Sequence, residues 1–272
     1  MYCAFCTRSY AIGAPTESVK KRSYIPARRR WDEALKYIDD NPNVNDVVVS
    51  GGDSFYLEPS QLMYIGQKLL QIPHVKRIRL ASKGLAVCPM RLIDESDGWA
   101  DCLIQLSREG REKGKELALH THFNHPNEIT WVTSLAARKL FREGVTVRNQ
   151  TVLLRGVNDN VATMSRLIRE LANLQITPYY VYQADMVKGV EDMRTPLSTI
   201  LDLEAEIRCS IAGFMMPRFV VDLPGGGGKV PALSYKTYNR ESGVSTFGSP
   251  LAPDRVFMYH DPLRQVLGQG KS

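Results

Sequence analysis

Short apolar runs alternate along the chain with longer stretches of helical periodicity. The apolar runs are rich in β-branched residues, as buried strands are, and span residues 46–50, 75–80, 117–123, 145–154, 177–183 and 218–222. The helical stretches span residues 60–70, 129–143, 161–174 and 198–212, and Leu62, Ile65, Leu69 and Leu70 share one face of the first. This alternation predicts repeated strand–helix units around a parallel sheet.

Polar residues lie at the C-terminal end of nearly every predicted strand: Asp53, His122, Gln150, Asp185 and Asp222. In a barrel, complete or partial, the carboxyl ends of all strands converge on one mouth, so these residues would form one site. In a doubly wound sheet only the ends near the switch point would meet. Periodicity alone leaves both folds open.

Two further segments are less regular. Residues 86–115 predict a helix followed by a charged surface loop, and the residues after Lys229, rich in Gly, Ser, Tyr and Pro, predict an irregular C-terminal extension. We therefore divide the chain into a barrel domain, residues 1–224, and a glycine-rich loop with the extension, residues 225–272.

Composition narrows the functional classes. With 43% hydrophobic residues, the 272-residue chain can bury a core. The sequence has neither an apolar run of about 20 residues nor a signal-peptide pattern. This predicts a cytoplasmic protein, or an organellar one if a targeting segment has been lost. The net charge of +6 lies partly in two basic clusters, 20–22 and 28–30. Without interleaved aromatics these favour a solvated rim or an anionic cofactor over nucleic acid. Five cysteines, an odd number, argue against a disulfide framework.

Cys3 and Cys6 are spaced to chelate one metal ion. A zinc site would need a second pair of ligands. His120 and His122 are available, but they lie on one predicted strand among other polar groups, which disfavours structural zinc. A thioredoxin-like pair would need a preceding strand. A [4Fe–4S] cluster with one open iron needs three thiolates. The spacing matches the last two members of a Cys-x-x-x-Cys-x-x-Cys triplet.

Glycines mark two places where backbone could approach a ligand. The first is a run before Lys229, an amine that can form a Schiff base with pyridoxal phosphate or simply be a solvated lysine on a flexible loop. The run consists of Gly225, Gly226, Gly227 and Gly228. At the second place, Gly51 and Gly52 precede Asp53, which could bind an amine or cap a helix.

Three more charged residues suit an amino-acid ligand. Asp185 and Asp222 could clamp an ammonium group or cap helices, and Arg8 could meet an anion beside the thiols or lie at the surface.

Several blocks in order resemble one known family. They are residues 1–8, 50–53, 121–130, 149–159, 178–183, 194–196 and 219–231. On these blocks, over almost the whole chain, the sequence resembles the lysine 2,3-aminomutase family of the radical S-adenosylmethionine superfamily.

The resemblance implies a partial (βα)6 TIM-like barrel of the radical S-adenosylmethionine type and an isomerase that moves the α-amino group of L-lysine to the β-carbon. It implies three cofactors: a [4Fe–4S] cluster on Cys3 and Cys6, pyridoxal 5'-phosphate on Lys229, and S-adenosyl-L-methionine. The glycines Gly225, Gly226, Gly227 and Gly228 would adjoin pyridoxal phosphate, and the group around S-adenosyl-L-methionine would be Gly51, Gly52, Asp53, His122 and Gln150.

The resemblance also implies how the substrate is held. It places Arg8 on the substrate carboxylate, and Asp185 and Asp222 on the side-chain ammonium. The implied partners are free lysine, an electron donor and other copies of the chain, with no nucleic acid and no membrane.

The family pattern also includes parts that this sequence lacks. The family has a helical N-terminal region, a first barrel strand and a third cysteine, all of which would precede Met1. We therefore expect an N-terminally incomplete chain that lacks its first strand and has negligible mutase activity. The alternative is a genuine short variant. Two further functions stay open. One is a β-lysine-forming enzyme that serves the modification of elongation factor P, and the other is a non-catalytic remnant that binds pyridoxal phosphate.

Overall fold

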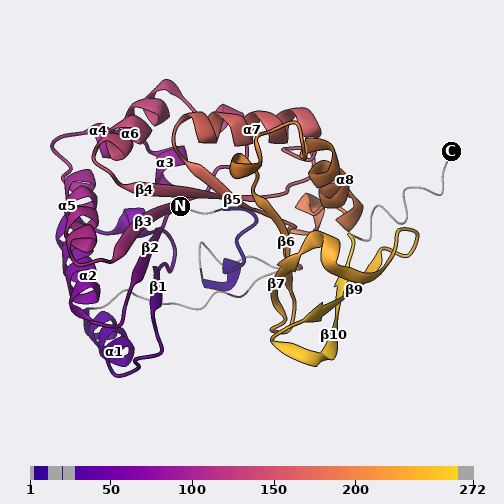
Figure 1. Cartoon of the computed structure of the whole chain (residues 1–272), viewed down its shortest axis with the longest axis horizontal. Coiled ribbons are helices and arrows are strands. Elements are labelled where there is room, and N and C mark those ends of the chain that lie inside the picture. The colour runs from indigo at the N-terminus through magenta and orange to yellow at the C-terminus, as the bar shows by residue number, and fades with distance from the viewer. Residues whose placement is uncertain (1–2, 12–19, 21–27, 263–272) are drawn as a thin grey trace.

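Six parallel strands follow one another in chain order across the main sheet. The computed structural model describes residues 3–11, 20 and 28–262, and the strands are β1 (Asp46–Val49), β2 (Arg77–Ala81), β3 (Glu116–Thr121), β4 (Thr146–Val152), β5 (Thr177–Tyr182) and β6 (Arg218–Leu223). A seventh strand, β7 (Gly228–Pro231), pairs antiparallel with β6. The order β1 to β7 never reverses. The sheet therefore has no switch point and curls into a partial barrel rather than a doubly wound sheet (Figure 1).

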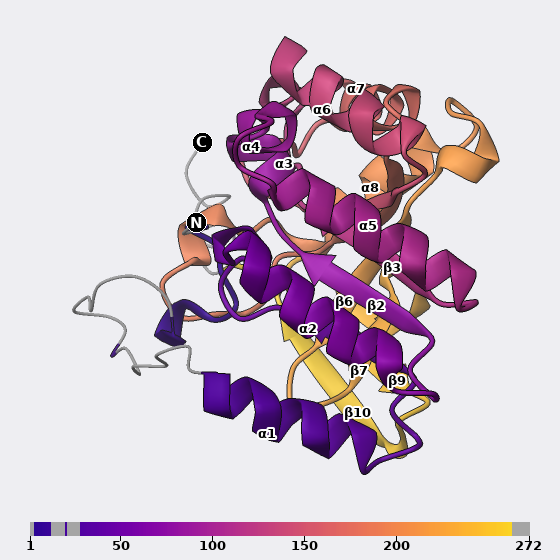
Figure 2. The same cartoon turned by 90° about the vertical axis from the view of Figure 1, so that its left-hand side faces the viewer.

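Helices cover the convex face of this sheet. The four predicted helices are confirmed as α2 (Pro59–Gln71), α6 (Trp131–Arg142), α7 (Val161–Asn173) and α8 (Leu197–Ile207). A further helix, α1 (Arg28–Asp39), packs beside α2, and Figure 2 shows α1, α2 and α5 side by side along the outside. The four apolar residues expected on one face of α2 are all buried. The concave face is left for the short segment 3–11 and for polar side chains.

The segment 86–115 is more helical than its charge pattern predicted. It contains α4 (Met90–Ile93) and α5 (Trp99–Glu112), after α3 (Gly84–Val87). Residues 108–112, expected in a charged loop, form the last turns of α5, because Leu103, Leu106 and Gly110 keep one face of the helix buried while the charges point outward.

The expected irregular extension is a regular antiparallel sheet. Its strands are β8 (Tyr235–Asn239), β9 (Val244–Ser249) and β10 (Ala252–His260), in the order β10-β9-β8. Phe247, Phe257 and Tyr259 are buried in one apolar cluster with residues of β6 and α8. The inward positions of β9 alternate, but two of them are serines, so hydrophobic periodicity was weak there. The domain division at residue 224 stays a prediction.

Some predicted features lie outside the described residues. They are Met1 and Tyr2 of the cysteine block, two residues of the first basic cluster, and the final stretch 263–272 of the extension. Within the described part, no helix is both long and apolar enough to cross a membrane.

Candidate active site

One cavity of about 560 Å³ lies where the carboxyl ends of the parallel strands meet the N-terminal segment. It brings together most of the residues singled out from the sequence, namely Cys3, Cys6, Arg8, Gly52, Asp53, His122, Gln150, Asp185, Asp222 and Lys229. The convergence of strand ends expected of a barrel therefore joins residues from both ends of the chain.

Five glycines expected at the cofactors do not line this cavity. They are Gly51, Gly225, Gly226, Gly227 and Gly228. Gly225, Gly226 and Gly227 lie in the connection between β6 and β7, and Gly228 is the first residue of β7. The next residue, Lys229, lines the cavity.

The two thiols enter the cavity on a tight turn. The amide of Cys6 donates to the carbonyl oxygen of Cys3 at 3.0 Å, and the intervening Phe5 stacks on the His122 ring with centroids 5.3 Å apart. Burial raises the pKa of the Cys3 thiol, although the nearby Lys83 ammonium acts against this shift. The stacked pair fixes the cysteine turn against the end of β3.

His122 is held as a neutral imidazole. Burial, with the nearby positive charge of Lys83, lowers the pKa of His122 to about 3. Its Nε2 atom is buried and has no hydrogen-bond partner within the described residues. The ring can therefore offer a hydrogen bond to a ligand at any physiological pH.

Asp53 is occupied by backbone groups. Its Oδ1 accepts from the amide of Phe55 and its Oδ2 from the amide of Lys83, both at 2.9 Å, so the carboxylate joins the ends of β1 and β2. The capping role weighed for Asp53 is thus present. Before it, Gly51 has φ of +142°, a conformation that favours glycine, and a Cβ there would meet no atom within 4 Å.

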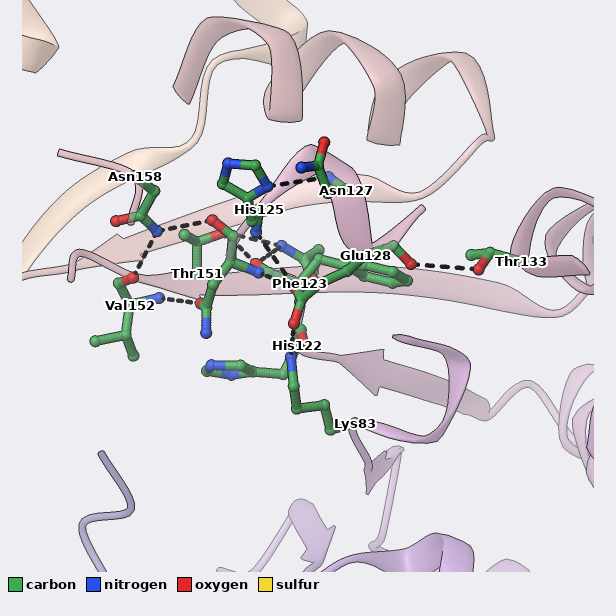
Figure 3. Close-up of polar contacts among 12 residues, drawn as sticks. Lys83, His122, Phe123, His125, Asn127, Glu128, Thr133, Thr151, Val152 and Asn158 are labelled. Carbon is green, nitrogen blue, oxygen red and sulfur yellow. Dashed lines mark hydrogen bonds and ion pairs between the residues drawn. The ribbon is translucent and has the colours of Figure 1, made fainter. Parts of the chain in front are cut away.

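Lys83 and Glu128 are site residues that the sequence reasoning missed. The Lys83 ammonium lines the cavity and donates to the carbonyl oxygen of His122 at 2.8 Å and to Glu128 at 2.5 Å (Figure 3). Glu128 in turn accepts from the amide of Asn124 at 2.6 Å. This network positions the His122 loop. Lys83 follows a predicted strand, so the rule that selected the other strand-end residues could have selected it.

The acidic side of the cavity is built by β5, β6 and β7. Asp222 and Lys229 are paired in register across β6 and β7, with Oδ2 and Nζ 3.3 Å apart, and the Lys229 ammonium lies 5.8 Å from the centre of the Tyr182 ring. Asp185 follows β5 and has no ion-pair partner among the described residues. Burial, followed by the charge of Asp222, raises the pKa of Asp185 to about 6.

The glycine run before Lys229 forms the tight connection from β6 to β7. Gly225, Gly226 and Gly228 have positive φ, of +74°, +90° and +72°. Gly227 is needed for packing instead, because a Cβ there would lie 2.6 Å from the Cβ of Leu223. The turn and its packing therefore require these glycines without any ligand. Their contact with pyridoxal phosphate stays a prediction.

A polar chain crosses the floor of the cavity. The Tyr179 hydroxyl donates to Gln150 at 3.0 Å and lies 3.3 Å from Nδ1 of His120, whose other ring nitrogen lies 3.4 Å from Arg148. Across residues 3–11, 20 and 28–262, no three Cys, His, Asp or Glu side chains gather where they could hold a metal ion. The described residues therefore offer an iron–sulfur cluster two thiols and no third ligand.

Curated relatives share long stretches of this sequence. L-lysine 2,3-aminomutase of Clostridium subterminale is 40% identical over 233 residues, which are 86% of this chain and 52% of that protein. A putative L-lysine 2,3-aminomutase of Aquifex aeolicus is 34% identical over 249 residues, 92% and 63% of the two chains. Glutamate 2,3-aminomutase of Clostridioides difficile is 35% identical over 233 residues, 86% and 51%. No protein-family model matches.

Solved structures resemble the fold at low sequence identity. Streptococcus suis SuiB bound to S-adenosylmethionine superposes with a TM-score of 0.54 at 15% identity, covering 80% of this chain and 47% of SuiB, and another SuiB structure gives 0.53 at 14%, covering 99% and 59%. The curled parallel sheet thus has the same fold as the corresponding part of SuiB. The chain spans about half the length of the first curated relatives. Over most of its own length the chain is 34–40% identical to curated relatives that are named L-lysine 2,3-aminomutase.

Proposed function

We propose that the protein is an aminomutase for a cationic amino acid, L-lysine, whose α-amino group it moves to the β-carbon. The observation that carries this proposal is Asp185, a half-buried carboxylate in the cavity without a cationic partner among the described residues. The carboxylate of Asp222 lies close enough to raise the pKa of Asp185. Two acids in one cavity favour an ammonium group, so lysine suits the site better than glutamate, which the relative of Clostridioides difficile is named for.

The chain's own residues would bind both ends of lysine. Asp185 and Asp222 would receive the side-chain ammonium, and Arg8, beside the thiols on the same cavity wall, would pair with the carboxylate. Binding of the ammonium removes the repulsion between the two carboxylates. Asp222 would then share its charge between the substrate and Lys229.

The surroundings of Lys229 fit pyridoxal phosphate. Its side chain is 44% exposed at the cavity, so an aldehyde can reach the amine, and the Tyr182 ring offers a flat surface beside it. The cofactor would supply an electron-accepting ring that holds the migrating amine. Burial raises the pKa of Tyr182, so its phenol stays neutral beside the cofactor.

The opposite wall fits S-adenosylmethionine in part and an iron–sulfur cluster incompletely. The Nε2 of His122, which has no partner among the described residues, the open space at Gly52 and the polar Gln150 would hold a nucleoside. Cys3 and Cys6 supply two thiolates where the family pattern uses three, so the described residues do not complete a cluster site. A complete cluster would also need an electron donor.

Trapping of pyridoxal phosphate on the protein tests the cofactor assignment. Borohydride reduction of the protein mixed with pyridoxal phosphate should leave the label on the peptide that contains Lys229, as read by mass spectrometry. The variant Lys229→Ala should lose this label, and the matched control Lys236→Ala, on β8, should keep it. Equal labelling of surface lysines in all three proteins would refute the assignment.

Calorimetric titration tests the substrate class. L-Lysine should bind at neutral pH and L-glutamate should not, and Asp222→Asn should weaken lysine binding about tenfold or more, since it removes one of two charges from a partly buried site. Preference for glutamate would refute the proposal. If the protein binds a lysine residue of elongation factor P in place of free lysine, the result would favour an enzyme that serves the modification of that factor. If it binds the cofactor but no amino acid, the result would favour a non-catalytic protein that only binds pyridoxal phosphate.

A further inference from the structure

Arg79 is a cation in the cavity that has no partner among the described residues. It lies on the concave face of β2, in register with Val48 of β1 and Ala118 of β3, and lines the cavity. Its Nε atom is buried and makes no hydrogen bond within the described residues, which also provide no ion pair for its guanidinium. The small and apolar side chains beside it on the neighbouring strands cannot supply one.

All but one of the acids in and beside the described part of the cavity are already engaged. Glu116 binds Arg148 with both carboxylate oxygens, at 2.7 and 3.1 Å. Asp53 accepts from two backbone amides, and Asp222 pairs with Lys229. The remaining acid, Asp185, lies at the far side of the sheet, after β5.

The polar side chains that contact the floor around Arg79 add no negative charge at neutral pH, and the nearby carboxylate of Asp46 is bound by Arg77. Burial, together with the charges of Arg148 and Arg79, lowers the pKa of His120 to about 4, so its ring is neutral. Burial raises the pKa of Tyr179 to about 12, so its hydroxyl keeps its proton. The floor of the cavity therefore combines one unpaired cation with neutral hydrogen-bonding groups.

We propose that Arg79 forms an oxyanion subsite at the floor of the cavity, which binds the phosphate or carboxylate group of a ligand. Arg79 is partly buried, and a partly buried cation without a partner among the described residues costs free energy that a bound anion would remove. The planar guanidinium suits either oxyanion because it can donate two parallel hydrogen bonds. If the proposed function holds, the anion belongs to pyridoxal phosphate or to the methionyl carboxylate of S-adenosylmethionine.

A ligand-binding arginine and a structural arginine respond oppositely to removal. Without ligand, Arg79→Gln should unfold at the same or a higher temperature than the wild type, because the unpaired charge is gone. A structural arginine would lower the melting temperature when removed. Arg77→Gln is the matched control, since Arg77 is on the same strand, is 52% exposed and pairs with Asp46.

Inorganic phosphate tests the subsite independently of the proposed function. At constant ionic strength, replacing chloride by phosphate should raise the melting temperature of the wild type and of Arg77→Gln, but not that of Arg79→Gln. Arg79→Lys should retain part of the rise. An equal rise in Arg79→Gln and in the wild type, or no rise in any of them, would overturn the inference.

Two cofactor titrations identify the source of the anion. If it is the phosphate, Arg79→Gln should weaken pyridoxal phosphate at least tenfold, or about 1.4 kcal/mol, and leave pyridoxal unchanged. If it is the carboxylate, the same loss should appear for S-adenosylmethionine and not for its decarboxylated form. Cofactors that bind equally to the wild type and Arg79→Gln would overturn the inference alone. A wild type that binds neither cofactor, yet binds phosphate through Arg79, would overturn the proposed function alone.

Discussion

The substitution Asp185→Asn should stabilise the protein when no substrate is bound. Asp185 has a pKa of about 6 in the folded chain against an ordinary value of 3.8, chiefly because burial disfavours its charged form and Asp222 repels it. A difference of about 2 units corresponds to about 3 kcal/mol of destabilisation above pH 6. Because the carboxyl keeps part of its solvent contact, we expect about 1–2 kcal/mol from removing the charge.

The pH dependence gives the sign of this effect. The penalty is fully present above pH 6, where both folded and unfolded chains carry the charge, and it is lost as the pH falls towards 4, where both hold the proton. Urea unfolding at pH 8 should therefore give a larger free energy of unfolding for Asp185→Asn than for the wild type, with the gap shrinking at pH 5. Asp101→Asn, at an acid that is 67% exposed, should differ little from the wild type at either pH. A less stable Asp185→Asn at pH 8 would refute the reasoning and remove the main support for a cation site.

Two further substitutions probe the scaffold by the same unfolding assay. Lys115 is buried, and its ammonium donates to the carbonyl oxygens of Leu70 and Ile72 at the end of α2. Lys115→Met should therefore lower the free energy of unfolding by about 1–3 kcal/mol. An unchanged urea midpoint would contradict this capping role. Gln175 follows the end of α7 with φ of +60°, and its amide and that of Ile176 donate hydrogen bonds back to carbonyl oxygens of the helix. Gln175→Gly should raise the free energy of unfolding by about 0.5–1 kcal/mol, because glycine adopts this conformation without strain. A loss of stability would show that the side chain matters more than the backbone strain.

The sequence anticipated much of the barrel because its signals are local. Each strand is a short apolar run between helical stretches, and polar residues at strand ends such as His122 and Asp185 needed only the rule that parallel strands end at one edge. The C-terminal sheet was missed because its strands are stabilised by pairing with one another and by contact with β6 and α8. Its inward serines therefore gave no apolar signal.

The sequence alone determined the order of strands and helices, the residue types at the mouth and the resemblance to the aminomutases, since these depend on neighbours along the chain. Only the tertiary structure decided which charges are compensated. Asp53 is saturated by two amides, whereas Asp185 and Arg79 have no partner in the described part of the chain. An ionisable group's free energy depends on burial and on charges a few ångströms away, and those come from residues that are distant in sequence.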